Sequence, residues 1–197
     1  MSHGKNFVLN NLRDRLRPTL EGIGRTFAST GLSPNFWTSI GLAFAIASSV
    51  VYGLAIEFGL IIGGALLLIS GFFDMVDGQV ARVTGKTSKK GEYFDSMSDK
   101  IAEVAIFLGI LIGGYAEPYL VFLAVTISLL VSYARAKSDA INVKLQGVGI
   151  GERAERLLVI AVIGMIGFME PAVIIVVLIA AITLIQRMIV TRRSMKE

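Results

Sequence analysis

The sequence predicts an all-α integral membrane protein, with six transmembrane helices preceded by an N-terminal juxtamembrane amphipathic helix. Three observations favour this fold class. Apolar residues make up 54% of the 197-residue chain and charged residues only 17%, whereas soluble domains are about a quarter charged. Six runs approach the ~20 mostly apolar residues that are needed to cross a bilayer. Lysine and arginine residues gather at alternate ends of these runs.

The apolar runs define the expected helices. The first begins at Ser33, a favourable N-cap, followed by Pro34, which suits the first position of a helix. The expected spans are residues 33–56, 58–81, 93–115, 118–140, 152–169 and 171–190. Residues 6–28 mix basic and apolar positions, which suits a helix on the membrane surface, with a solvated tail as the alternative. We therefore divide the chain into a cytoplasmic N-terminal segment, residues 1–32, and a six-helix membrane domain, residues 33–197.

Positive charge sets the expected orientation. All 19 lysine and arginine residues lie in the N-terminal segment, in residues 82–100, in residues 135–156, or from residue 187 onward. The opposite connections carry only acidic charges, at Glu57, Glu117 and Glu170. Because basic loops stay on the cytoplasmic side, both termini and both long basic loops are expected in the cytoplasm. We therefore expect a multi-pass protein of the cell membrane.

The composition limits the metal chemistry that is available. The chain has no cysteine and a single histidine, His3. Disulfides and thiolate metal sites are thereby excluded, and a bound metal must use oxygen ligands or His3. His3 lies close to the chain terminus, where residues are seldom held in place, so oxygen ligands are expected.

Acidic residues stand where the second and third apolar spans approach the cytoplasm. Asp74 and Asp77 are three residues apart and share a helix face, while Asp95, Asp99 and Glu103 form one stripe. Two facing helices would bring the four aspartates to one point, where they repel one another unless paired or metal-bound. Hard divalent cations prefer oxygen ligands, so the pattern predicts a Mg²⁺ or Mn²⁺ site. The fifth acid, Glu103, serves either to support this site or to pack the helix.

Small and basic residues are interleaved with these acids. Gly78 and Ala81 lie on or beside the face of the first two aspartates, where they let a base or a phosphate approach the helix closely. Alternatively, the small side chains of both residues serve only to let helices pack tightly. Gly91 comes one turn before the third aspartate, and Arg82 adds positive charge at the same end. The nearby loop lysines are explained equally well by membrane topology.

Together these residues spell Asp74-x2-Asp77-Gly78-x2-Ala81-Arg82-x8-Gly91-x3-Asp95-x3-Asp99. This pattern resembles the signature of the CDP-alcohol phosphotransferase family at each of its fixed positions. The resemblance implies transfer of a lipid-phosphate group from a CDP-lipid to a hydroxylated acceptor, with release of CMP, at a cytoplasmic site. It implies two metal ions on the four aspartates, with Asp99 as ligand and general base, and commonly a homodimer. The implied CDP-lipid site consists of Asp74, Asp77, Gly78, Ala81, Arg82 and Gly91.

A second basic set follows the fourth span. Arginines bind phosphate oxygens through a rigid fork of donors, so this set suggests an acceptor that is itself a phosphate ester. Topology signalling and contact with lipid headgroups form the alternative. Residues 132–137, residues 152–156 and the pair Gln186 and Arg187 resemble the phosphatidylinositol-phosphate synthase branch of the family, which implies L-myo-inositol 1-phosphate as acceptor. Its phosphate would be held by Arg135, Arg153 and Arg187, with Lys137 and Arg156 as further candidates.

Several alternatives stay open at this stage. Glycerol 3-phosphate also carries a phosphate and is the next acceptor in line. The donor is either CDP-diacylglycerol or CDP-archaeol, because the apolar spans do not distinguish ester from ether chains. An ion or proton transporter also places acids inside a membrane, but it favours the midplane and repeated broken helices. The expected partners are the two substrates and membrane lipids, and no nucleic acid.

Overall fold

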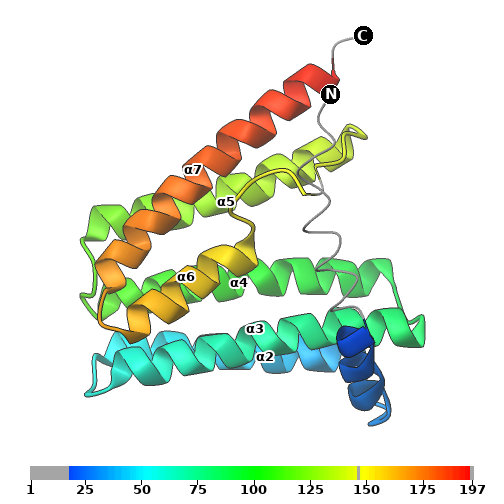
Figure 1. The fold of residues 1–197 in the computed structure, drawn as a ribbon, viewed down its shortest axis with the longest axis horizontal. Helices are drawn as coiled ribbons and strands as arrows, with labels where there is room; N and C mark the ends of the chain where they lie inside the picture. Colours follow the sequence, from blue (N-terminus) through cyan, green and yellow to red (C-terminus); the bar gives the residue numbers. More distant parts are fainter. Residues whose placement is uncertain (1–17, 146, 196–197) are drawn as a thin grey trace.

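The computed structural model describes residues 18–145 and 147–195, and among these residues there is no strand. Residues 18–28 form the first described helix, drawn in dark blue in Figure 1. The part of the expected surface helix before residue 18, and His3 with it, lies outside the described residues. The longer helices are α2 (Pro34–Leu54), α3 (Gly59–Thr84), α4 (Lys89–Ile112), α5 (Pro118–Ala140), α6 (Arg153–Met165) and α7 (Met169–Ser194).

Local signals account for several helix ends. The Ser33 side chain accepts a hydrogen bond from the Phe36 amide and caps α2, which confirms the N-cap predicted from the sequence. Ser88 caps α4 in the same way, accepting from the Gly91 amide at 3.0 Å. Gly85 ends α3 with a left-handed φ of 65°, which favours glycine. The short connection between α3 and α4 makes the two helices antiparallel. Each packs against α2, and their acidic side chains meet beside it.

The helices form two groups, which are joined by α6 and by a smaller contact of α4 with α5. Helix α2 packs against α3 and α4, while α5 packs against α7, and α6 contacts both α3 and α7. Figure 1 shows the chain turning back toward the middle of the bundle after α5, before α6 begins. The first residue of α6 is thereby brought inside the bundle, close to α3 and α4.

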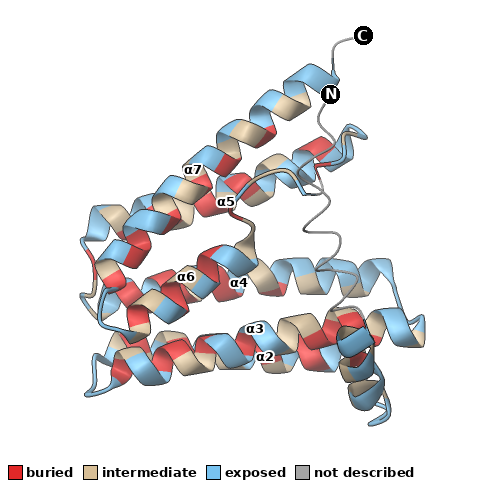
Figure 2. Cartoon of the chain, viewed as in Figure 1, coloured by how far each residue is buried: buried red, intermediate tan, exposed pale blue. Residues whose placement is uncertain are grey.

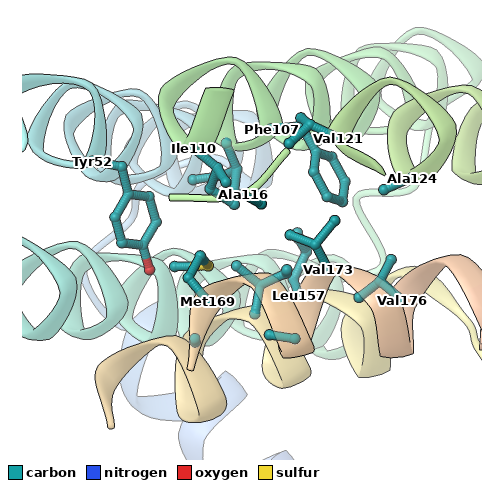
Figure 3. Close-up of a cluster of buried hydrophobic side chains, with 14 of the residues drawn as sticks. Tyr52, Phe107, Ile110, Ala116, Val121, Ala124, Leu157, Met169, Val173 and Val176 are labelled. Carbon is teal, nitrogen blue, oxygen red and sulfur yellow. The ribbon is translucent and has the colours of Figure 1, made fainter. Parts of the chain in front are cut away.

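The core lies where the two groups meet. Figure 3 shows buried side chains from α2, α4, α5, α6 and α7 facing one another, among them Tyr52, Phe107, Val121, Leu157 and Val173. The outer sides of the helices are exposed instead (Figure 2). They carry large apolar side chains, such as Phe122 at 67% and Ile112 at 65% exposure. An apolar outer surface of this kind suits contact with lipid.

The predicted all-helical fold is confirmed for the described residues, and the helices differ in how well they fit a bilayer. Helices α2, α3, α5 and α7 are long and apolar enough to cross one. Helix α4 has 24 residues but carries charges in its first half. Helix α6 has 13 residues, about 20 Å at 1.5 Å per residue, against a hydrocarbon core of about 30 Å. The count of six crossings therefore stays a prediction.

The helix of residues 18–28 lies across the ends of α2 and α3 (Figure 1). Phe27 packs edge-to-face against Trp37, with ring centroids 4.9 Å apart. A Cβ added to Gly24 would lie 3.0 Å from the Gln79 Cβ, so this helix approaches α3 closely. The N-terminal helix is thereby held beside the end of α3 that carries the acids.

Candidate active site

Three of the four predicted aspartates meet at the α3–α4 hairpin. Asp74 of α3 and Asp95 and Asp99 of α4 each offer a carboxylate oxygen, and these oxygens all lie within 4.8 Å of one another. Asp77, one turn further along α3, is not part of this group. It is 6% exposed, and its Oδ2 atom is buried without a hydrogen-bond partner among the described residues.

The donor set of this cluster fits a hard divalent cation. Carboxylates this close repel one another when ionised, and an ion held by all three removes that repulsion. The unpartnered oxygen of Asp77 is a further ligand for a cation, since a buried polar atom without a partner costs free energy that a bound ion would recover. None of the described residues is a cysteine or a histidine, which disfavours soft metals.

A first cleft of about 430 Å³ opens between α2, α3 and the start of α4. Its lining includes five of the predicted residues, namely Asp77, Gly78, Ala81, Gly91 and Asp95. A Cβ added to Gly78 would meet nothing within 4 Å, so the helix surface there is open to a ligand. Arg82 is exposed and is not among the lining residues, and Asp74 faces elsewhere.

Asn35 and Thr38 of α2 also line the first cleft and were missed by the sequence analysis. They are polar residues three positions apart at the start of an apolar span, so they share a helix face. That spacing is a signal that could have found them. Thr87 and Ser88 of the connecting loop complete the polar rim.

A second cleft of about 680 Å³ lies on the other side of the acids, between α4, α5, α7 and the start of α6. It combines acidic and basic side chains: Asp74, Asp95, Asp99, Arg135, Arg153, Arg156 and Arg187. Lys137 is exposed and stands outside this lining, whereas Ser132 and Tyr133 belong to it. Asp95 and Glu92 border both clefts, so the two clefts share a wall of acids at the edge of the aspartate cluster.

Arg153 connects the basic set to the acids. Its Nη1 atom donates to Asp74 Oδ1 at 3.0 Å and to Asp99 Oδ1 at 2.5 Å, and its side chain is 16% exposed. A capping box of Glu152 and Glu155 starts α6 and fixes Arg153 in the first turn. The charged run that looked like a topology signal therefore also builds a helix start beside the acid cluster.

The other buried arginines are engaged within the protein. Arg187, at 3% exposure, donates from Nε to the Val148 carbonyl and from Nη1 to the Val131 carbonyl. Arg156 is paired with Glu103, which is completely buried. Arg135 is exposed at the mouth of the second cleft.

The fold and the site together define a multi-pass helical membrane protein with a carboxylate centre between two clefts. Residues 32–193 match the family described as CDP-alcohol phosphatidyltransferase, and the chain belongs to this family. This result confirms the family predicted from the eight-residue signature, and with it the class of enzyme.

Relatives of similar length exist in archaea. The chain is 32% identical to the archaetidylinositol phosphate synthase of Pyrococcus horikoshii, over 96% of this chain and 99% of the relative. It is 34% identical to the enzyme of the same name from Methanothermobacter thermautotrophicus, over 96% of both chains. The fold is similar to a crystal structure of Mycobacterium tuberculosis phosphatidylinositol phosphate synthase with CDP-DAG bound. That match has a TM-score of 0.76 at 22% identity, and it covers 87% of this chain and 92% of that one.

Proposed function

We propose that the protein transfers the lipid-phosphate group of a CDP-lipid to L-myo-inositol 1-phosphate and releases CMP, as a step of phospholipid biosynthesis. The observation that carries this proposal is the shared wall of acids between a cleft with an open helix surface and a basic cleft. Relatives of at least 30% identity are named archaetidylinositol or phosphatidylinositol phosphate synthases. The donor is CDP-archaeol or CDP-diacylglycerol.

Asp74, Asp95 and Asp99 would hold Mg²⁺ or Mn²⁺, and the free oxygen of Asp77 supports a second ion beside them. A related fold has been crystallised with manganese and citrate, which supports a divalent-metal site. When bound, the ions neutralise the diphosphate oxygens and stabilise charge on the departing CMP.

The first cleft is the donor site in this proposal. Asp77, Gly78, Ala81 and Gly91 face it, and the open surface at Gly78 gives a phosphate or the cytosine ring direct access to the helix. Arg82 stands outside the lining, so its role is that of a positive charge near the entrance.

The second cleft is the acceptor site. Arg135 and Arg153 supply charge-assisted hydrogen bonds to the acceptor phosphate. Arg187 adds its Nη2 atom, which the Val131 and Val148 carbonyls do not use and which lies 3.8 Å from Glu152 Oε1. Lys137 adds positive charge outside the lining. Asp99 lies at the acid wall of this cleft, where it can take the proton from the attacking hydroxyl as the general base.

We further propose that α4 and α6 supply the third and fifth crossings, so that residues 33–197 form a six-helix domain. Residues 6–28 would lie on the cytoplasmic membrane surface, with both termini and the active site on the same side. The location of every lysine and arginine at one end of the helices supports this orientation. A homodimer, as expected for the family, stays a prediction.

A product assay tests the proposal. Purified protein is given CDP-diacylglycerol or CDP-archaeol with inositol 1-phosphate, glycerol 3-phosphate, inositol or serine, in Mg²⁺ or in EDTA. We expect CMP release and a new phosphorylated lipid with inositol 1-phosphate and Mg²⁺. Faster turnover with glycerol 3-phosphate would move the protein to the alternative acceptor, and turnover in EDTA would contradict the metal assignment.

A further inference from the structure

Two charged pairs connect α4 and α6. Arg153 Nη1 lies 2.5 Å from Asp99 Oδ1, and Arg156 Nη2 lies 2.7 Å from Glu103 Oε1. Each member of the second pair comes one turn after a member of the first, so both pairs share the facing sides of the two helices. The backbones of α4 and α6 approach less closely than those of α3 and α6. The arginine side chains therefore span the distance that backbone packing leaves.

The two pairs differ in exposure. Asp99 and Arg153 have 22% and 16% of their side chains exposed, while Glu103 and Arg156 have 0% and 1%. Arg156 uses Nε and Nη2 for the Glu103 carboxylate and donates from Nη1 to the Gly151 carbonyl at 2.8 Å. All three nitrogens thus have acceptors within the protein, although Arg156 borders the second cleft.

The contact with Gly151 reaches the loop that leads into α6. This loop lies against α7, because a Cβ added to Gly151 would lie 3.2 Å from the Thr183 Oγ1. Arg187 holds the same loop from α7 by donating to the Val148 carbonyl at 3.1 Å. Through Arg156 the loop is also tied to α4, so the start of α6 has a fixed place relative to both neighbouring helices.

We propose that the buried pair of Glu103 and Arg156 positions Arg153 against Asp99 and against the phosphate of the acceptor. This inference rests on the proposed function, since it concerns the phosphate ester in the second cleft. Arg156 acts through Arg153 and does not touch the acceptor, so it is a positioning residue. None of the described residues that line the first cleft belongs to α6. A change in this pair therefore acts on the acceptor and spares the donor.

Arg156→Lys tests the proposal with the charge retained. One ammonium group cannot reproduce the planar fork that holds both a carboxylate and the Gly151 carbonyl, so the start of α6 is expected to shift. We expect the acceptor KM to rise about tenfold and the CDP-lipid KM to stay within about twofold. The Tm is expected to fall, because the substitution weakens a buried ion pair, so both KM values are measured at a temperature where the variant is folded. Glu103→Gln, which keeps the shape of the side chain, is expected to act in the same direction. Arg192→Lys, an exposed position of α7 outside both clefts, is the control and should change neither KM.

A double-mutant cycle separates positioning from a general loss of structure. If Arg156 acts through Arg153, Arg156→Lys causes little further loss of acceptor kcat/KM once Arg153 is alanine. Additive losses, an equal rise in both KM values, or an unchanged acceptor KM in Arg156→Lys and Glu103→Gln overturn the proposal. If the proposed function is wrong, the product assay shows it separately, because the unsubstituted protein then turns over another acceptor faster than inositol 1-phosphate. The same cycle run with that acceptor still tests Arg156.

Discussion

Arg153→Ala probes the junction between the acids and the acceptor site. In the structure its guanidinium bridges Asp74 and Asp99 at 3.0 and 2.5 Å and borders the second cleft. A hydrogen bond to a charged group contributes about 1.5 to 3 kcal/mol, so losing one to the acceptor phosphate lowers kcat/KM for the acceptor by roughly 10- to 200-fold. The CDP-lipid KM is expected to stay nearly unchanged, because Arg153 does not line the first cleft.

The same substitution should act in the opposite direction on the metal. The guanidinium of Arg153 pairs with two of the three carboxylates whose oxygens lie within 4.8 Å of one another. Two unit charges 4 Å apart interact by about 4 kcal/mol at an effective dielectric constant near 20, and exposure to solvent reduces this. Removing the arginine should therefore tighten Mn²⁺ binding by about tenfold, which titration calorimetry measures on the protein without substrates.

The assay varies the acceptor at saturating CDP-lipid, with inositol 1-phosphate and free inositol in parallel. Free inositol lacks the phosphate, so it should be a poor acceptor that is almost indifferent to Arg153→Ala. Arg153→Lys should restore only part of the loss, since an ammonium group lacks the two-pronged geometry. Equal impairment with both acceptors, or weaker Mn²⁺ binding in the alanine variant, would refute the reasoning and indicate a structural role for Arg153.

Three further predictions concern the acids and the helix packing. Asp95→Asn should abolish turnover while leaving the thermal melt nearly unchanged. EDTA should also abolish turnover, and adding Mg²⁺ or Mn²⁺ should restore it. Full activity in EDTA would contradict the metal assignment. Asp99→Asn should keep nucleotide binding within about tenfold but slow the chemical step by about 10²- to 10⁴-fold in single-turnover measurements; loss of CDP-lipid binding would make it chiefly a metal ligand. Gly109→Ala should destabilise the protein by about 1 to 3 kcal/mol, because its new Cβ would lie 2.3 Å from the Ser49 carbonyl oxygen. Gly71→Ala, with nothing within 4 Å of the new Cβ, is the matched control, and an equal fall in Tm for both variants would contradict the packing argument.

Much of the fold follows from local signals in the sequence. The predicted start of α2 is confirmed because the Ser33 cap and the following proline act within one helical turn. Helix α5 runs from Pro118 to Ala140, the predicted bounds, because charge or proline marks each end. The short α6 was not foreseen. Its start at Arg153 is one residue from the predicted one, but it ends at Met165 instead of residue 169. The chain turns there, with Gly167 at a left-handed φ of 90°, and the apolar residues that continue past this turn hide the break from hydropathy.

The candidate site divides in the same way. The meeting of Asp74, Asp95 and Asp99 was foreseen, because their spacing fixes a common helix face on each side of a short hairpin. The position of Asp77 in the lining of the first cleft, away from the other three aspartates, was not foreseen, although Asp77 lies only one turn from Asp74. The pairing of Glu103 with Arg156 joins residues 53 positions apart. Such contacts depend on the tertiary placement of α6, which no periodicity in one sequence encodes.

The donor and acceptor clefts draw on different parts of the chain. Residues 34–95 supply the first cleft, whereas the arginines of the second come from residues 135–187. Under the proposed function, the two halves of the gene are therefore exposed to different selection. The first must preserve the handling of a nucleotide that the chemistry always requires, while the second can diverge toward a new alcohol. A chimaera that joins the first half of this chain to the second half of a relative is accordingly a practical route to altered headgroup specificity.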